Sequence, residues 1–249
     1  MKFSKTVKNF ILTLAAMIAV GASAEAGCSW AGTYTNVTNP RVVPASYQYV
    51  VTDINNNQAC RTGSFTTYGA IIAIRANNGY AYNNIPIGLA NNLKSAVKNG
   101  YRISDVHITE RGNYIVIFGS NGYQTTGAPE AMINDIAEIR GKGDTIMSAC
   151  FNDFGEYIVV TDDTIYYNLR NGGENYIYRA KTEYGKILSA SMTNNSAVFC
   201  CEQGVYLMNV PGHLLQGLNT VDFVPRTVKY TDKGAFLITD GVGSYYYWL

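Results

Sequence analysis

The sequence predicts a mainly β protein with short helices, arranged as a five-bladed propeller-like toroid. Three observations lead to this fold class. A tight turn recurs five times at intervals of about 40 residues, an apolar strand follows each turn, and a helix-like stretch separates most units. Units of this size cannot bury their own apolar faces, so they must stack on their neighbours. A closed ring of five leaves only short edges exposed.

Each unit begins with a hairpin. The repeated turns are TTYG, TERG, NDFG, TNN and TDKG, which end at Gly69, Gly112, Gly155, Asn195 and Gly234. Stretches with period-two alternation precede four of the five turns, as in Ile103–Ile108 and Ile146–Phe151, and predict the first strand. The apolar strands after the turns are AIIAI, NYIVIF, EYIVV, SAVFCC and AFLIT. A third strand begins near a tyrosine that recurs at the same place in every unit: Tyr80, Tyr123, Tyr166, Tyr206 and Tyr245.

A short helix follows the third strand in four units. Pro86 and Pro129 precede apolar residues at helical spacing, in the stretches Gly88–Gly100 and PEAMINDIAEI. Proline suits the first turn of a helix, because its missing N–H is not needed there. Weaker helical patterns, ENYIYRAKTEYG and GHLLQGLNTV, follow in the third and fourth units. The repeated unit is therefore strand, strand, strand, short helix.

The predicted organisation is a signal peptide over residues 1–26 and one repeat domain over residues 27–249. The units cover approximately residues 62–100, 101–143, 144–186, 187–225 and 226–249. The last unit stops after three strands. Residues 47–53, YQYVVTD, alternate as a strand does and predict an N-terminal strand that completes this unit and closes the ring. The main alternative is an open solenoid.

The N-terminus predicts export. Lys2, Lys5 and Lys8 precede the apolar run Phe10–Gly21, and the small residues of ASA and AEA follow it. This pattern is typical of a cleaved signal peptide and indicates a secreted or periplasmic protein. The alternative is a lipid anchor at Cys28, although the motif preceding that cysteine fits a lipoprotein poorly. No other stretch is long and apolar enough to cross a bilayer.

All five cysteines follow the predicted cleavage site, and an oxidising compartment favours disulfides among them. A bond between Cys28 and Cys60 is expected first, because it would fix the irregular N-terminal segment. A bond from Cys150 to either Cys200 or Cys201 is expected second, which leaves one thiol over. None of the cysteine spacings matches a metal-binding pattern, and the sequence predicts no metal and no cofactor.

Within the second unit, Gly112 and Tyr114 form a G-x-[WY] turn, Asn121–Tyr123 an N-G-[YW] turn, and Pro129 with Ile133 opens the helix. In this pattern the second and third units resemble a class of secreted bacterial repeat proteins with units of about 43 residues. The resemblance implies a propeller-like repeat architecture and no assigned activity. It fades toward the fourth and fifth units.

Five units of strands and a helix around a pseudo-fivefold axis are also similar to the pentein fold of guanidine-modifying enzymes, an α/β-propeller. That resemblance implies a late nucleophilic cysteine, a partner histidine and acidic groups. In this chain the last cysteines, Cys200 and Cys201, lie inside an apolar strand, and His107 stands where the next unit has Cys150. Since the catalytic pattern is absent, only the topology is similar.

Residues suited to catalysis are few. His107 lies in a strand whose alternation places Glu110 on the opposite face, so an acid–base pair is not expected. His213 opens the fourth helix and is expected to face solvent. Glu110, Asp153 and Asp232 each lie two residues before a turn glycine, where a carboxylate stabilises the turn by bonding its own backbone. The sequence therefore predicts no catalytic residue.

The function expected from these features is an exported, non-catalytic binding or scaffold protein that presents loops to a glycan or an extracellular protein. The net charge is +1 and no basic stripe is present, which argues against nucleic acid. The candidate ligand-binding residues are the recurring tyrosines, Tyr80, Tyr123, Tyr166, Tyr206 and Tyr245. They either stack on sugars, as in a lectin with repeated sites, or pack between blades. A second alternative is an extracytoplasmic glycoside hydrolase-like enzyme, which needs paired carboxylates.

Overall fold

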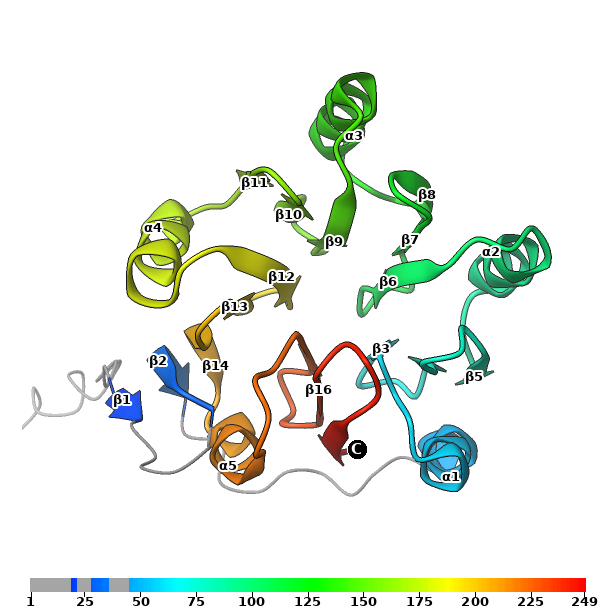
Figure 1. Ribbon diagram of the computed structural model, residues 1–249, viewed down its shortest axis with the longest axis horizontal. Helices are drawn as coiled ribbons and strands as arrows, with labels where there is room; N and C mark the ends of the chain where they lie inside the picture. Colours follow the sequence, from blue (N-terminus) through cyan, green and yellow to red (C-terminus); the bar gives the residue numbers. More distant parts are fainter. Residues whose placement is uncertain (1–18, 22–27, 36–44) are drawn as a thin grey trace, which may run out of the picture.

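The computed structural model describes residues 19–21, 28–35 and 45–249, which are mainly β with short helices. Their strands form five small sheets arranged in chain order around a common centre (Figure 1). The predicted signal peptide, residues 1–26, falls mainly outside the described residues. Of that segment, only residues 19–21 are described, as strand β1. In the described residues no helix has the length and apolar character of a membrane span.

Each sheet contains three consecutive antiparallel strands. The first sheet consists of β3 (Thr62–Phe65), β4 (Ile71–Ile74) and β5 (Tyr80–Asn83). The second consists of β6 (Ile103–Ile108), β7 (Tyr114–Phe118) and β8 (Gly122–Thr126). The third consists of β9 (Ile146–Phe151), β10 (Tyr157–Thr161) and β11 (Ile165–Asn168). The fourth contains β12 (Ile187–Met192), β13 (Ala197–Cys201) and β14 (Val205–Pro211). The fifth is β15 (Thr227–Tyr230), β16 (Phe236–Thr239) and β17 (Tyr245–Trp248).

The described helices are η1 (Ala45–Tyr47), α1 (Gln48–Asn57), α2 (Ile87–Lys98), α3 (Glu130–Lys142), α4 (Gly173–Tyr184) and α5 (His213–Thr220). Each α-helix lies between two neighbouring sheets and buries one face there. Helix α2 places Leu89 and Leu93 against Ile72 and Ile74 of the first sheet and against Val106 of the second. Helices α3, α4 and α5 fill the next three interfaces in the same way. Helix α1 packs between the fifth sheet and the first.

The first strands of the sheets contact one another in the order β3, β6, β9, β12 and β15, and β15 also contacts β3. Two hydrogen bonds join the fifth sheet to the first. The Thr239 hydroxyl donates to the Arg61 carbonyl oxygen at 2.5 Å, and the Cys60 amide donates to the Gly243 carbonyl oxygen at 3.1 Å. The last sheet is therefore attached to the first by backbone groups as well as by α1.

The prediction of a strand over residues 47–53 is wrong, because Tyr47 ends η1 and the rest of the segment lies in α1. Its alternation suits a strand, but Tyr47, Val50 and Ile54 are also spaced to share one face of a helix. All three are buried between the first and last sheets, where Ile54 packs in one cluster with Leu237. Every other sheet interface is filled by a helix, so tertiary packing overrides the local pattern here.

The N-terminal strand that the structure does contain joins the fourth sheet. Strand β2 (Trp30–Thr35) pairs in parallel with β14, and β1 (Ala19–Gly21) pairs antiparallel with β2. The Trp30 indole N–H donates to the Asn219 side-chain oxygen at 2.9 Å, which ties β2 to the end of α5. This strand is an addition outside the five repeated units.

The predicted disulfides are not formed: all five cysteines are free and buried. Cys28 packs in the cluster around α5 because β2 joins the fourth sheet, whereas Cys60 lies in the cluster around α1. Cys200 and Cys201 point to opposite faces of β13, so only Cys201 shares a cluster with Cys150. Burial raises the pKa of the Cys60 and Cys150 thiols to about 12. The cysteines act as small apolar core residues.

The hairpin turns explain the repeated glycine. Four of the turn glycines have φ between 82° and 95°, a conformation that glycine adopts without steric cost: Gly69, Gly112, Gly155 and Gly234. The fourth turn is one residue shorter, because the Thr193 amide donates to Ser196 where the Thr66 amide donates to Ala70. This shorter turn does without the glycine and shortens the fourth repeat.

We predict that Ile54→Ala lowers the free energy of unfolding by about 2–5 kcal/mol, because it opens a cavity between the first and last sheets. The matched control is Asn56→Ala, an exposed position on the same helix, which is expected to change the free energy by less than about 0.5 kcal/mol. Urea unfolding of the full chain measures both. Equal stability of the two variants would show that α1 does not belong to the cooperative core.

Candidate functional site: the central pocket and the hairpin face

Polar side chains gather where the first strands meet. Three positions of each first strand and its turn carry polar or small residues in every unit, and all of these are buried or half-buried. The first position holds Thr62, Asp105, Ser148, Ser189 and Thr227; the second holds Ser64, His107, Cys150, Ser191 and Lys229; the third holds Thr66, Thr109, Asn152, Thr193 and Thr231. The centre of the arrangement is therefore a hydrogen-bonded core instead of an apolar one.

The most buried charges form an ion pair at this centre. Lys229 Nζ lies 2.8 Å from Asp105 Oδ1, and both side chains are 4% exposed. The pair lacks the angular alignment of a hydrogen bond, and Lys229 Nζ has no other partner among the described residues. Asp105 also accepts hydrogen bonds from the Thr62 hydroxyl (3.2 Å), the Ser148 hydroxyl (2.9 Å) and the Ala149 amide (3.2 Å). One carboxylate thus joins strands of four sheets.

His107 lies beside this pair and is neutral at pH 7. Its Nε2 is 2.6 Å from the Phe151 carbonyl oxygen, which can only accept, so Nε2 carries the proton. Burial, and then the positive charge of Lys229, lower the pKa of His107 to about 4. In the described structure no hydrogen bond joins His107 to Glu110. His213 is not exposed as expected: it is buried and packs on Trp248, with ring centroids 4.8 Å apart.

A small cavity, the central pocket, opens at the turn end of this core. It has a volume of about 30 Å³, and its lining includes Ser64, His107, Glu110, Asn152, Asn194 and Lys229. A buried water needs roughly 10–15 Å³ of such space, so the central pocket has room for one or two water molecules. Pockets that hold drug-sized ligands measure about 300–1,000 Å³. The central pocket therefore has no room for an organic ligand of that size.

The outside at this end is formed by the five turns that join first and second strands, residues 66–69, 109–112, 152–155, 193–196 and 231–234; we call it the hairpin face. Neighbouring turns are tied by side chains. The Glu110 carboxylate accepts two hydrogen bonds from Thr67, from its amide (3.0 Å) and its hydroxyl (2.7 Å). The Thr193 hydroxyl donates to Asp232 at 2.6 Å. The sequence predicts that each carboxylate bonds the backbone of its own turn. In the structure, Glu110 and Asp232 instead bond the adjacent turn.

The hairpin face carries negative charge close to the central pocket. Burial raises the pKa of Glu110, hydrogen bonds from Thr67 oppose the rise, and the carboxylates of Asp232 and Asp153 raise the pKa further. Glu110 therefore feels the negative charges of two aspartates on other turns of the hairpin face. Within the described residues, no group of three histidine, cysteine or acidic side chains is placed to hold a metal ion.

Two aromatic side chains project from the tips of the turns. Tyr68 is 78% exposed and Phe154 is 54% exposed, although each follows a strand whose other residues are buried. The corresponding positions of the second and fifth turns hold Arg111 and Lys233, both exposed. The hairpin face therefore differs from unit to unit, with aromatic tips on the first and third turns and basic tips on the second and fifth.

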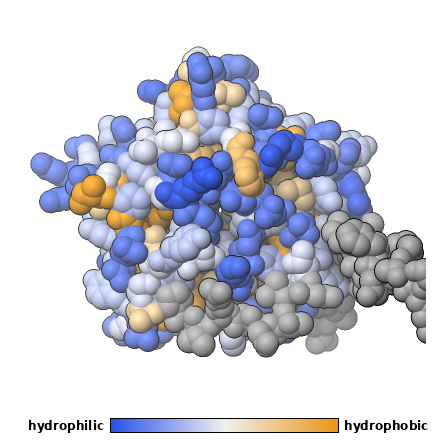
Figure 2. All heavy atoms as spheres, turned by 180° about the vertical axis from the view of Figure 1, so that it is seen from behind, coloured by the Kyte–Doolittle hydropathy of each residue, from blue (hydrophilic) through white to orange (hydrophobic). Residues whose placement is uncertain are grey.

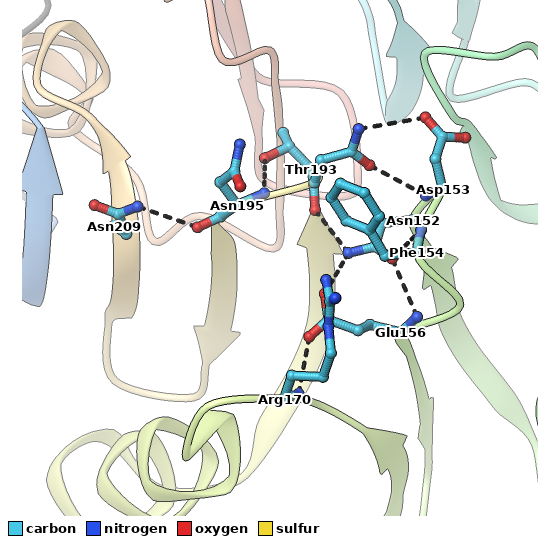
Figure 3. A network of polar contacts seen from close by, with 9 residues as sticks. Asn152, Asp153, Phe154, Glu156, Arg170, Thr193, Asn195 and Asn209 are labelled. Carbon is cyan, nitrogen blue, oxygen red and sulfur yellow. Dashed lines mark hydrogen bonds and ion pairs between the residues drawn. The ribbon is translucent and has the colours of Figure 1, made fainter.

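Phe154 is held in place by a chain of polar contacts (Figure 3). The guanidinium carbon of Arg170 lies 4.7 Å from the centroid of the Phe154 ring. Arg170 donates to the Glu156 carboxylate from its side chain (3.0 Å) and its amide (2.8 Å). The Asn152 side-chain amide donates to Glu156 at 2.6 Å and to the Thr193 carbonyl oxygen at 3.3 Å. The ring therefore has one face on Arg170 and the other directed away from it.

The recurring tyrosines do not come together in one site. Tyr206 is fully buried, and the other four are partly buried, each against the core of its own part of the molecule: Tyr80, Tyr123, Tyr166 and Tyr245. The Tyr245 hydroxyl donates to the Ile54 carbonyl oxygen at 3.4 Å, and the Tyr166 hydroxyl contacts Lys142 at 3.0 Å. Sequence reasoning missed Tyr68 and Phe154, because the repeat shows no aromatic preference at the turn tip.

The face of the molecule seen in Figure 2 carries no broad apolar patch. Apolar side chains form small groups there, separated by hydrophilic ones. Stable protein interfaces have a desolvated, mostly apolar core, and this face does not show one.

Comparison with known proteins gives little further information. No family model matches the chain, and no curated protein matches it. Among solved structures, it is similar to one described as "Streptogramin B lyase structure", with 8% identity and a TM-score of 0.27 over 74% of this chain and 63% of that chain. The chain thus spans less than two thirds of that protein's length. A likeness this low supports no inference about function.

We predict that Lys229→Met lowers the free energy of unfolding by about 3–5 kcal/mol, because it leaves the buried Asp105 carboxylate without its countercharge. The double variant Asp105→Asn/Lys229→Met is expected to be more stable than Lys229→Met alone, since asparagine is uncharged and still accepts hydrogen bonds. Lys142→Met, which removes an exposed lysine, serves as the control and should unfold like the wild type. A double variant no more stable than Lys229→Met would contradict the ion-pair interpretation.

His107 also predicts a pH dependence. Its folded-state pKa of about 4 lies below the unfolded value of about 6.5, so the unfolded chain binds the proton first as the pH falls. The stability contribution is complete above pH 6.5 and decreases toward pH 4, by roughly 3 kcal/mol in total. His107→Gln, which keeps a donor for Phe151, should lack this part of the dependence. Urea titrations of both proteins from pH 7 to pH 4 measure the difference, and parallel curves would refute it.

Proposed function

We propose that the five sheets form a closed five-bladed propeller-like toroid whose units each consist of one helix followed by three strands. The contact of β15 with β3 and the hydrogen bond from Thr239 to Arg61 support closure. Further support comes from α1, because its Asn55 side chain forms hydrogen bonds of 3.0 and 3.1 Å with the Tyr247 hydroxyl of the fifth sheet. The helix of the first unit thus also contacts the last sheet, as expected for a closed ring.

We propose that the protein is an exported, non-catalytic binding or scaffold protein whose ligand surface is the hairpin face. The observation that carries this proposal is the exposure of Tyr68 and Phe154 on turns that are otherwise fixed by hydrogen bonds. Exposed aromatic side chains on a rigid support lose little conformational entropy on binding and are common anchors of recognition surfaces. The ligand is a glycan or an extracellular protein.

Secretion or a periplasmic location follows from the N-terminal pattern of the sequence. Cys28 also bears on the choice between a free and a lipid-anchored protein. Its thiol is buried in the cluster around α5, and burial raises its pKa to about 12. A lipid on this sulfur would have to leave the core together with β2, so we favour the protein without an anchor.

Two alternative functions have less support than the binding role. A lectin with a sugar site in every unit would use Tyr80, Tyr123, Tyr166 and Tyr245, which keep part of their surface exposed. A glycoside hydrolase-like enzyme would use Glu110 as the acid, because burial, and then the charges of Asp232 and Asp153, raise its pKa. Against the enzyme, Glu110 is already engaged by Thr67, and the central pocket holds only a water or two.

The binding function predicts a loss on removal of the exposed aromatics. The purified chain is screened against an array of glycans and cell-wall polymers and against extracellular proteins. The double variant Tyr68→Ala/Phe154→Ala is expected to lose saturable binding, by about tenfold or more in affinity, while keeping its unfolding midpoint. Tyr178→Ala, which removes a tyrosine 70% exposed on α4, should bind normally.

The outcome distinguishes the functions. Binding that is lost with Tyr123→Ala but kept by the double variant would favour the lectin with repeated sites. Release of new reducing ends from a polymer, abolished by Glu110→Gln, would favour the hydrolase and reject a non-catalytic role.

A further inference from the structure

Phe154 differs from the other exposed aromatics because its orientation is fixed by a dedicated set of contacts. Arg170 covers one face of the ring, Glu156 holds Arg170, and Asn152 holds Glu156 (Figure 3). Among the five turns, only this one pairs an exposed aromatic tip with a cation in contact with its ring in the described residues. Such support keeps a flat apolar surface in one orientation before any ligand arrives.

Polar groups suited to hydroxyls lie on the turn of Phe154 and on the next turn along the chain. The Asp153 amide donates to the Asn194 side-chain oxygen at 3.1 Å, and the Asn194 amide approaches Asp153 Oδ2 at 3.4 Å. Asp153 Oδ1 is buried and has no hydrogen-bond partner among the described residues, so a ligand hydroxyl could reach this carboxylate only at Oδ2. The exposed Asn195 lies on the next turn, where its carbonyl oxygen accepts from the Asn209 side chain at 3.1 Å. Carboxylates and amides offer both acceptors and donors to neighbouring hydroxyls.

The charges of the hairpin face favour an uncharged ligand. Three turns of the hairpin face carry a carboxylate, those of Glu110, Asp153 and Asp232, and Glu110 lines the central pocket. The exposed cations Arg111 and Lys233 stand at the tips of other turns, so the two signs nearly balance. A polyanion would meet Asp153 directly beside Phe154, and a polycation would meet Arg170. A like charge at contact distance is a strong barrier to binding.

We propose that Phe154, supported by Arg170, is a stacking platform for one pyranose ring of a neutral glycan, whose hydroxyls hydrogen-bond to Asp153, Asn194 and Asn195. This site rests on the proposed binding function and names its ligand class. It uses one asymmetric position of the repeat instead of five equivalent ones. A protein ligand is less suited to this turn, because a stable protein interface buries about 1,200–2,000 Å² with an apolar core.

Isothermal titration calorimetry of the full chain tests the site with four soluble probes: cellohexaose, maltohexaose, N-acetylchitohexaose and the anionic hexagalacturonate. At least one neutral probe is expected to bind, and hexagalacturonate is expected to bind at least tenfold more weakly. Phe154→Ala is expected to weaken the neutral probe about tenfold, which corresponds to about 1.4 kcal/mol. Phe154→Tyr keeps the ring and should retain the affinity. Tyr178→Ala, which removes an exposed tyrosine on α4 outside the hairpin face, should leave this probe within about threefold.

Folding is monitored by the unfolding midpoint, so that loss of structure is not mistaken for loss of the platform. Arg170→Gln adds a second variant that leaves Phe154 in place; it frees the ring and is expected to weaken binding several-fold. Equal affinity of Phe154→Ala and the wild type would overturn the platform, and tighter binding of hexagalacturonate would overturn the neutral ligand class. If none of the glycans binds while an extracellular protein does so through Tyr68 and Phe154, the platform proposal fails and the binding function stands.

Discussion

The arrangement of the sheets depends on one buried carboxylate. Asp105, in the second sheet, accepts from Thr62 of the first, from Ser148 and Ala149 of the third, and faces Lys229 of the fifth. The Ser148 hydroxyl also approaches the Ala190 carbonyl oxygen of the fourth sheet at 3.0 Å. A buried charge of this kind is tolerated only when it is paired and hydrogen-bonded. A shift of any of these strands would break a contact of the Asp105 carboxylate and destabilise the fold.

A polar centre has a consequence for the location of ligands. Small hydroxyl side chains such as Ser64 and Ser191 let the first strands approach closely, and the space that remains is about 30 Å³. A channel or a deep cleft, the usual place for a substrate, is thereby excluded at the axis. The same hydrogen bonding continues at the turns, from Thr67 to Glu110, and limits the motion of the exposed side chains there.

The repeat made much of the fold predictable, because glycine in the turns and proline before the helices have specific backbone requirements that the sequence shows directly. The segment containing Val50 and Ile54 was less predictable, since its apolar spacing suits both a strand and a helix, and only the space beside the fifth sheet decides. The disulfides were wrong because cysteine spacing does not show that β2 joins the fourth sheet. Phe154 carried no signal, because its contact with Arg170 depends on the fold.

Repetition itself separates structural residues from functional ones in this molecule. The tyrosines that recur in every unit pack against the clusters around α1, α2, α3 and α4, and Tyr206 does so most completely. Residues that break the repeat fall into two groups. Those at the centre, Asp105 and Lys229, compensate each other's charge and serve the assembly. Phe154 breaks it at the surface, where Arg170 holds an exposed aromatic ring in one orientation, and this is why we place the proposed ligand there.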